Sequence, residues 1–367
     1  MNVAALLHLA LSGLLVLITG MPFLKTPLWW VRAGEFPRVQ IACLLLALLL
    51  VLPWLTDYPL GLGWPVGLAL AVCLAWQLWW ILPYARLARV EVAGATHVDA
   101  PNRLRVLSAN VLMTNPNKEA LIAQIQQYQP DLFVTLESDE RWEQALDTLG
   151  EQYPHQCKCP LDNLYGMHVY SRLALRDVHL EFLVEPDKPS MHMQVILASG
   201  QAVQMHFIHP APPSPTENET SSERDAELIV VAQQLAQNKQ PVVVAGDLND
   251  VAWSRTTRLF RRISGMLDPR LGRGFFNTFH AGHRLIRYPL DHFFHSRHFS
   301  LVSIHRLASI GSDHFPLLIE LQFETKSLQR QANEAHLEAD AEDRELADEL
   351  VEREDVTRSD VPTPGVS

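Results

Sequence analysis

The 367-residue chain is 48% hydrophobic and 19% charged, with a formal net charge of −11. This hydrophobic fraction excludes a disordered polymer, and four cysteines are too few for a disulfide-rich secreted module. The charge is unevenly distributed: residues 1–96 hold five Lys or Arg and three Asp or Glu, whereas residues 326–367 hold five and twelve. This pattern predicts a membrane region, a globular domain and an acidic tail.

Three long uncharged stretches occur within residues 1–90, at positions 1–24, 39–55 and 58–85. Each is close to the ~20 apolar residues that a helix needs to cross a bilayer core. The first stretch has no basic N-terminal region and a poor cleavage site, so we interpret it as an uncleaved helix and not as a signal peptide. The sequence therefore predicts a multi-pass protein of an inner or plasma membrane, with about three transmembrane helices and the lipid bilayer as a partner.

The basic residues that flank these stretches predict the orientation. Lys25, Arg32 and Arg38 lie between the first and second stretches, and Arg86 and Arg89 follow the third. With three crossings, all five fall on one side, and the positive-inside rule makes that side cytoplasmic. The large domain is therefore expected in the cytosol, and a helix count different by one would reverse this orientation.

Residues 97–325 alternate short apolar runs with amphipathic stretches, which is typical of a mixed α/β domain. Helices are expected at 118–128 and 222–238. Strands are expected at 104–111, 132–136, 166–171, 203–208, 241–245, 290–295 and 315–321. About 230 residues of this kind predict a sandwich-like domain with a sizeable core. The acidic tail, 326–367, is expected to be a solvated helix or disordered, and no obligate protein partner is evident.

Polar residues stand at or just beyond the ends of these apolar runs. They are Asn110, Glu137, His209, Asp247, Asn249, Asp291, Asp313 and His314. Ligand sites in α/β folds favour strand ends and the loops beyond them. If the strands run side by side, these side chains meet at one edge of the sheets.

Such a cluster has a recognisable chemistry. Converging carboxylates repel one another, and a divalent cation relieves that repulsion. Oxygen ligands without cysteine point to Mg²⁺ or Mn²⁺. The amides of Asn110 and Asn249 can donate hydrogen bonds to an anion, and His209 and His314 can transfer protons near neutral pH. Together these groups suit hydrolysis of a phosphate ester by in-line attack of water.

Spacing refines the expected roles. Asp247 and Asn249 are two residues apart, so in extended backbone they share one face. Asp313 and His314 are adjacent and point in opposite directions. Asp313 is therefore a poor candidate to orient His314, and Asp291 is a better one.

These residues lie in motifs that resemble the endonuclease/exonuclease/phosphatase superfamily, the DNase I-like fold, in the right order over about 103–323. The motifs are Ser108-Ala109-Asn110-Val111, 131–137, 166–172, His209 with Pro212 and Pro213, Gly246-Asp247-Leu248-Asn249, Leu290-Asp291-His292 and Ser312-Asp313-His314. Leu136 departs from the pattern, since many members have Gln before the motif glutamate. The resemblance implies a four-layer α/β sandwich and a Mg²⁺-dependent phosphodiesterase or phosphatase.

The resemblance also implies catalytic roles. His314, paired with Asp291, would be the general base or a transition-state contact. Asp247 and Asn249 would position the water and the phosphoryl oxygens, and His209 would be a general acid or a phosphate ligand.

The metal-side roles follow from the same resemblance. Glu137 would be the principal metal ligand, Asn110 would assist the metal and the phosphate, and Asp313 would be a second metal-side carboxylate. Asn110, Asn249 and His209 would contact the substrate.

The substrate is left open between nucleic acid and phospholipid, including phosphoinositide-type lipids. Eight arginines between Arg255 and Arg287 accompany a single acid, Asp268. We interpret them as solvated helix faces, and the alternative is a phosphate-rich partner such as nucleic acid or an anionic lipid surface. The alternative for the whole protein is a catalytically inactive membrane scaffold that uses the same fold to bind a partner.

Overall fold

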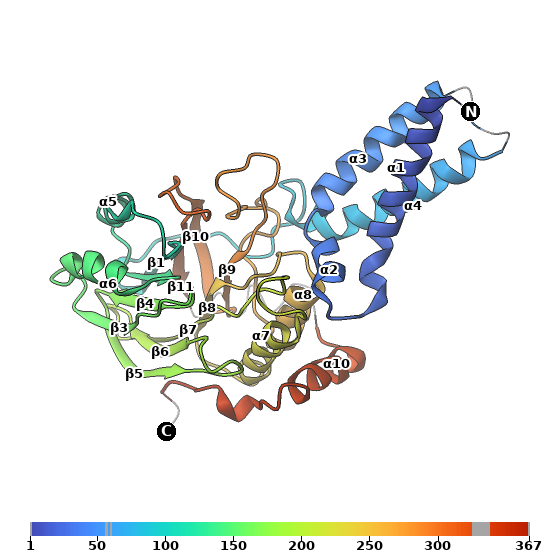
Figure 1. The fold of residues 1–367 in the computed structure, drawn as a ribbon. Helices are drawn as coiled ribbons and strands as arrows, with labels where there is room; N and C mark the ends of the chain where they lie inside the picture. The colour runs from blue at the N-terminus through green and yellow to red at the C-terminus, as the bar shows by residue number, and fades with distance from the viewer. Residues whose placement is uncertain (1, 56–57, 59–60, 325–337, 366–367) are drawn as a thin grey trace.

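The computed structural model describes residues 2–55, 58, 61–324 and 338–365. An N-terminal bundle of apolar helices stands beside a domain of two sheets, and helices cover the outer face of each sheet (Figure 1). The domain is thus a four-layer α/β sandwich, which confirms the predicted fold class.

The first sheet is mostly antiparallel, with strand order β10-β11-β1-β2-β4-β3. Its strands are β1 (Arg103–Asn110), β2 (Leu132–Leu136), β3 (His155–Cys159), β4 (Met167–Ser171), β10 (Phe299–Arg306) and β11 (Leu317–Phe323). Strands β1 and β2 are parallel, and Asn110 pairs with Leu136 at their ends. Glu137, the next residue, is therefore carried to the same edge as Asn110.

The second sheet has strand order β5-β6-β7-β8-β9. Its strands are β5 (Ala174–Glu181), β6 (Ser190–Ile196), β7 (Ala202–Phe207), β8 (Val242–Asp247) and β9 (Asp291–His295). Asp247 at the end of β8 pairs with Asp291 at the start of β9. The inner faces of both sheets share one apolar core, which includes Val134, Met205 and Val243. This packing holds the polar strand ends of the two sheets against each other.

Two helices cover each sheet. Helices α5 (Lys118–Tyr128) and α6 (Glu140–Leu146) lie on the first sheet, and α7 (Ser222–Leu235) and α8 (Arg255–Ser264) lie on the second. In α5, Leu121 and Ile125 are four residues apart and face the sheet together. Asp139 begins α6 by accepting a hydrogen bond from the backbone N–H of Trp142 at 3.0 Å.

The N-terminal bundle consists of three long helices and a short one. They are α1 (Val3–Gly20), α2 (Trp29–Arg32), α3 (Arg38–Val51) and α4 (Gly63–Ile81). Val3–Leu24 and Gly63–Tyr84 are long and apolar enough to cross a membrane. A third crossing requires Trp29–Glu35 and Arg38–Trp54, bent by 65°, to count as one span. The described helices therefore allow two or three membrane crossings, and the predicted number of three is the higher of these.

The bundle packs directly against the sandwich. Tyr84 donates a hydrogen bond to the carbonyl of Ala252 (2.5 Å), and the Trp253 indole N–H donates to the carbonyl of Glu35 (2.9 Å). Arg32 of α2 forms an ion pair with the buried Asp225 of α7 at 2.7 Å. Ala252 and Trp253, in the loop that follows β8, are thus held on one side by the bundle.

Part of the acidic tail is a packed helix. Residues 326–337 lie outside the described residues, but α10 (Ala341–Glu352) lies along α7 and α8 (Figure 1). Its Ala347, Leu350 and Val351 are buried in the apolar cluster over the second sheet. The tail is therefore helical over these residues, which is one of the two expected states, but one face of α10 is buried and not solvated.

Two of the arginines of residues 255–287 are buried, so the interpretation of this group as solvated helix faces is wrong for them. Arg261 is 4% exposed and pairs with Glu91 at 2.5 Å, and Arg270 is fully buried and pairs with Asp268 at 2.8 Å. These two guanidinium groups are structural, because buried cations persist when a carboxylate compensates them.

Glu227 of α7 gives the fold a pH dependence. It is 1% exposed, and burial raises its pKa to about 8. Between its ordinary pKa near 4.5 and about 8, the folded state binds the proton more tightly than the unfolded state, so stability should fall as the pH rises. We expect Glu227→Gln to remove this slope, in a series of thermal unfolding midpoints measured from pH 5 to pH 8. The exposed control Glu151→Gln should keep the wild-type slope, and an equal slope in Glu227→Gln would contradict the assignment.

Candidate active site

The polar strand ends of the two sheets meet through Asn110. Its side-chain N–H donates to Glu137 Oε1 at 2.7 Å and to Asp247 Oδ2 at 3.1 Å. Its side-chain oxygen accepts the backbone N–H of Leu112 at 3.1 Å, so the amide orientation is fixed at both ends. Asn110 is 1% exposed. One buried amide therefore links a carboxylate of the first sheet with one of the second.

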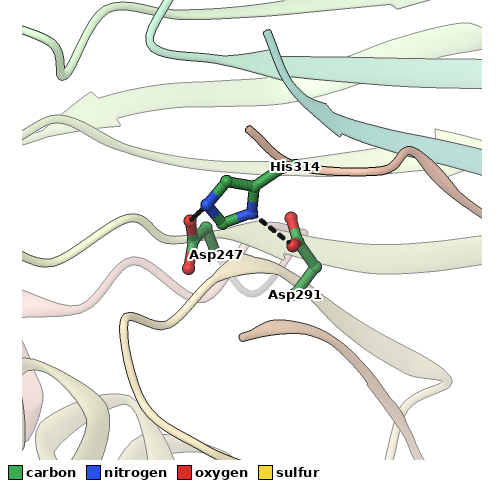
Figure 2. Close-up of side chains that lie close together, drawn as sticks. All are labelled: Asp247, Asp291 and His314. Carbon is green, nitrogen blue, oxygen red and sulfur yellow. Dashed lines mark hydrogen bonds and ion pairs between the residues drawn. The ribbon is translucent and has the colours of Figure 1, made fainter. Parts of the chain in front are cut away.

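His314 lies between two buried aspartates (Figure 2). Its Nδ1 is 2.8 Å from Asp291 Oδ2, and its Nε2 is 3.4 Å from Asp247 Oδ2. The backbone N–H of His314 donates to Ser312 Oγ, which fixes the start of the segment that leads into β11. Asp291, and not the adjacent Asp313, orients the imidazole, as the spacing argument predicted.

The electrostatics of this trio favour a charged imidazole. Burial acts to lower the pKa of His314, but the carboxylates of Asp247 and Asp291 outweigh it and raise the pKa to about 10. Burial is also the main reason that the pKa of Asp247 is raised above its usual value. At neutral pH, His314 is therefore a protonated hydrogen-bond donor held between two acids.

Glu137 lies next to this trio in an unusual backbone position. Its φ of +57° is in the left-handed region, which turns the side chain toward Asn110 as β2 ends. Burial raises the pKa of Glu137 to about 7, and Asp313 and Asp247 add to the rise. Asp313 is half-buried and accepts a hydrogen bond from Ser312 Oγ at 3.3 Å. A nearby cation would stabilise the charged form of a buried carboxylate in this position.

Two groups of side chains could hold a metal ion. Ligand atoms of Asp247, Asp291 and His314 all lie within 4.8 Å of one another. Both nitrogens of that imidazole already face carboxylates, an arrangement suited to ion pairing and proton transfer. Glu137 and Asn110 instead offer oxygen atoms, the donors that hard divalent cations prefer. The donor chemistry thus fits the predicted metal side of the site.

The turn after β8 is shaped around Asn249. Gly246 has a φ of +148°, and a Cβ there would lie 2.0 Å from the carbonyl oxygen of Ile208, so only glycine fits. Asn249, at φ +49°, donates its backbone N–H to Asp247 Oδ1 at 3.0 Å and its side-chain N–H to the carbonyl of Pro210 at 2.9 Å. The side chain is therefore fixed beside Asp247.

His209 completes the set from the end of β7. It is 2% exposed, its ring lies 5.1 Å from that of Tyr165, and its Nδ1 has no hydrogen-bond partner among the described residues. Burial lowers its pKa to about 4, although Asp247 acts in the opposite direction. A neutral imidazole fits a hydrogen-bonding ligand of a phosphoryl oxygen better than a proton-donating acid.

All eight candidate residues thus gather at one edge of the two sheets.

Several residues that support this site were not predicted from the sequence. Thr278 Oγ1 accepts the backbone N–H of Asp291 at 3.2 Å, and the Phe279 ring lies 5.0 Å from that of His314. Arg224 donates to the carbonyl of Asn249 at 2.9 Å. Thr278 and Phe279 lie outside the regular helices and strands, and no sequence signal marks them.

The chain is similar to a known protein family and to solved structures. The model of the Endonuclease/Exonuclease/phosphatase family matches residues 107–314, which include every candidate residue. TDP2 of D. rerio, complexed with a single-strand DNA product, is 18% identical with a TM-score of 0.50, over 60% of this chain and 99% of that one. The human Nocturnin catalytic domain, with bound sulfate anion, is 17% identical with a TM-score of 0.50, over 62% and 97%. No curated protein matches. At these identities the two likenesses establish the fold.

Proposed function

Because the chain belongs to the Endonuclease/Exonuclease/phosphatase family, we propose that it is a membrane-anchored phosphodiesterase that requires a divalent metal ion. One observation carries this proposal: His314 is held between Asp291 and Asp247 beside the Asn110–Glu137 pair. Paired acids, a charged imidazole and amide donors are the groups that in-line hydrolysis of a phosphoester needs.

Each side chain has a role in this proposal. Protonated His314 stays oriented by Asp291 through Nδ1. Its Nε2–H, which lies 3.4 Å from Asp247, turns to donate a hydrogen bond to a phosphoryl oxygen as negative charge develops there. Asp247 orients the attacking water and accepts its proton, and the Asn249 amide and the neutral His209 hold the other phosphoryl oxygens. The buried surroundings strengthen these interactions, because water does not screen them.

Glu137, Asn110 and Asp313 would hold the metal ion, with Mg²⁺ as the expected species and Mn²⁺ as a substitute. The raised pKa of Glu137 supports this assignment, since a buried carboxylate beside two other acids is relieved by a cation. When bound, the ion would neutralise phosphate charge and polarise a phosphoryl oxygen.

The substrate is a phosphoester of nucleic acid or of a phospholipid. The D. rerio relative carries a DNA product and the human one a sulfate anion, which favours anionic phosphate-like ligands for this fold. The apolar bundle favours lipid, because it would keep the site near a membrane surface. The two classes are separated by the substrate panel described below.

The domain is proposed to face the cytosol from an inner or plasma membrane. Lys25, Arg32, Arg38, Arg86 and Arg89 all belong to the end of the bundle that joins the sandwich, and such residues collect on the cytoplasmic side. A reporter fused after Ser367 should therefore be active in the cytoplasm, and a signal from the other side of the membrane would reverse the orientation.

The function is tested on the full chain in detergent. We expect hydrolysis of bis-p-nitrophenyl phosphate with Mg²⁺, abolished by EDTA and restored by Mg²⁺ or Mn²⁺. Asp247→Ala should lose turnover, whereas Glu151→Ala, a change at an exposed loop, should retain it. A parallel panel of DNA, RNA and phospholipids would assign the substrate class. Absence of turnover with every substrate and metal would favour the alternative, an inactive membrane scaffold with the same fold.

A further inference from the structure

A cavity of about 700 Å³ lies where the bundle meets α8 and α10. It is distinct from the candidate active site, because none of the candidate residues lines it. Lys25 and the C-terminal end of α4 form one side, and α8 forms another. The lining residues used below are Lys25, Trp79, Trp80, Arg255, Arg258 and Arg262.

The walls of the cavity carry charges of both signs. The bundle and α8 contribute cations. Helix α10 contributes the carboxylates of Glu342, Glu345 and Glu349, and Arg353 at its C-terminal end pairs with Glu349 at 3.5 Å. Some of these charges already meet across the cavity, since Arg262 pairs with Asp343 at 2.7 Å and Lys25 lies 3.7 Å from Glu342. A basic wall thus faces an acidic wall, and a ligand between them meets both.

Arg258 is a cation of the cavity wall that contacts an aromatic ring and carbonyl groups. Its guanidinium lies 3.9 Å from the centre of the Trp80 ring and donates to the carbonyls of Trp79 and Trp80. Within the described chain it has no carboxylate partner, although it is half-buried, and burial lowers its pKa to about 10. A partly desolvated cation of this kind is stabilised by an anion.

The position of the cavity indicates where that anion comes from. Lys25 directly follows the apolar helical stretch Val3–Leu24, and Trp79 is near the end of Gly63–Tyr84, with 69% of its surface exposed. Tryptophan and lysine at the ends of apolar helices mark the headgroup level of a bilayer. A ligand in this cavity is therefore at the depth of phospholipid headgroups when the helices are inserted.

We infer that this cavity binds the headgroup of a phospholipid that carries both a phosphate and an amine. The phosphate meets Arg258, with Lys25 and Arg255 beside it, and the amine meets the carboxylates of α10. A headgroup with phosphate alone would face the same carboxylates without a positive charge to match them. The inference depends on membrane insertion of the helices and is independent of the proposed hydrolysis.

The test measures lipid binding to the full chain in detergent by native mass spectrometry, with EDTA present so that no metal-dependent hydrolysis occurs. We expect phosphatidylethanolamine to bind about tenfold more tightly than phosphatidylglycerol, and Arg258→Ala to lose about tenfold of that affinity. Arg258→Lys should retain most of it. Arg176→Ala, which removes an exposed arginine of β5, should leave it unchanged.

A second variant tests the acidic wall without touching Arg258. The double change Glu342→Gln and Glu345→Gln should reverse the preference, so that phosphatidylglycerol binds at least as tightly as phosphatidylethanolamine. Equal affinities for the two lipids in the wild-type protein would overturn the inference. Free phosphoethanolamine that binds as tightly as the lipid would also overturn it, because the ligand would then be a soluble phosphate ester.

Discussion

His314→Gln should lower the turnover of a phosphodiester by about 10³-fold, the scale expected when a positioned acid–base or charge-stabilising group is removed. The glutamine amide can still hydrogen bond, but it cannot carry the charge that Asp247 and Asp291 stabilise. The two buried acids would then lose the positive charge between them, and their negative charges would repel each other. Steady-state kinetics on the full chain would separate the expected fall in kcat from any change in KM.

A matched histidine provides the control. His298 is half-buried, forms a hydrogen bond with Ser296 Oγ at 2.9 Å, and lies beyond the end of β9 that is opposite Asp291. His298→Gln should retain wild-type turnover. If His314→Gln loses less than tenfold while its thermal unfolding midpoint matches that of the wild type, His314 is not part of the reaction.

Asp225→Ala should lower the free energy of unfolding by about 3–5 kcal/mol, the cost of breaking a buried ion pair by removing one partner. Asp225 is fully buried and accepts hydrogen bonds from Arg224 and Arg32, each at 2.7 Å, and from Ser221 at 2.8 Å. Burial acts to raise its pKa, but the two arginines outweigh it and hold the pKa below its usual value. The alanine would leave the buried guanidinium of Arg224 and the half-buried one of Arg32 without their shared carboxylate. Denaturant titration of the full chain measures the loss.

The same variant should also reduce turnover, because Arg224 would no longer be held against the carbonyl of Asn249. Asp348→Ala is the control: this exposed carboxylate of α10 bonds only to Gln233 among the described residues. Its removal should change the free energy of unfolding by less than about 0.5 kcal/mol. A similarly small change in Asp225→Ala would show that the two arginines find other partners.

Much of the fold was predictable because its central elements are apolar in a regular pattern. The run at 132–136 is β2, and the apolar spacing of 118–128 is that of α5. Strands β3 and β5 were missed because their residues are largely polar or exposed, so burial leaves no continuous apolar signal. Strand β6 was not predicted, although its Met191, Met193 and Val195 alternate with polar residues, which is the pattern of a strand.

The candidate site was predictable to the extent that it lies at strand ends. Asn110 and Asp247 directly end apolar strands, so their type and position pointed to one edge of the sheets. Arg224 was not predictable as a support of Asn249, because it lies on a helix and its contact depends on how α7 packs. The pairing of Arg261 with Glu91, 170 residues away, likewise appears only in the folded chain.

The bundle shares an apolar cluster with the sandwich, in which Ile81 and Tyr84 pack with Val251, Ala252 and Trp253. Cutting the chain between the bundle and the domain would expose this apolar cluster to water, within a few residues of the Gly-Asp-x-Asn turn. The bundle is accordingly part of the packing that supports the candidate site. A fragment without the bundle, or a chimera with an unrelated membrane anchor, would lack these contacts. Its activity would therefore not represent that of the full chain.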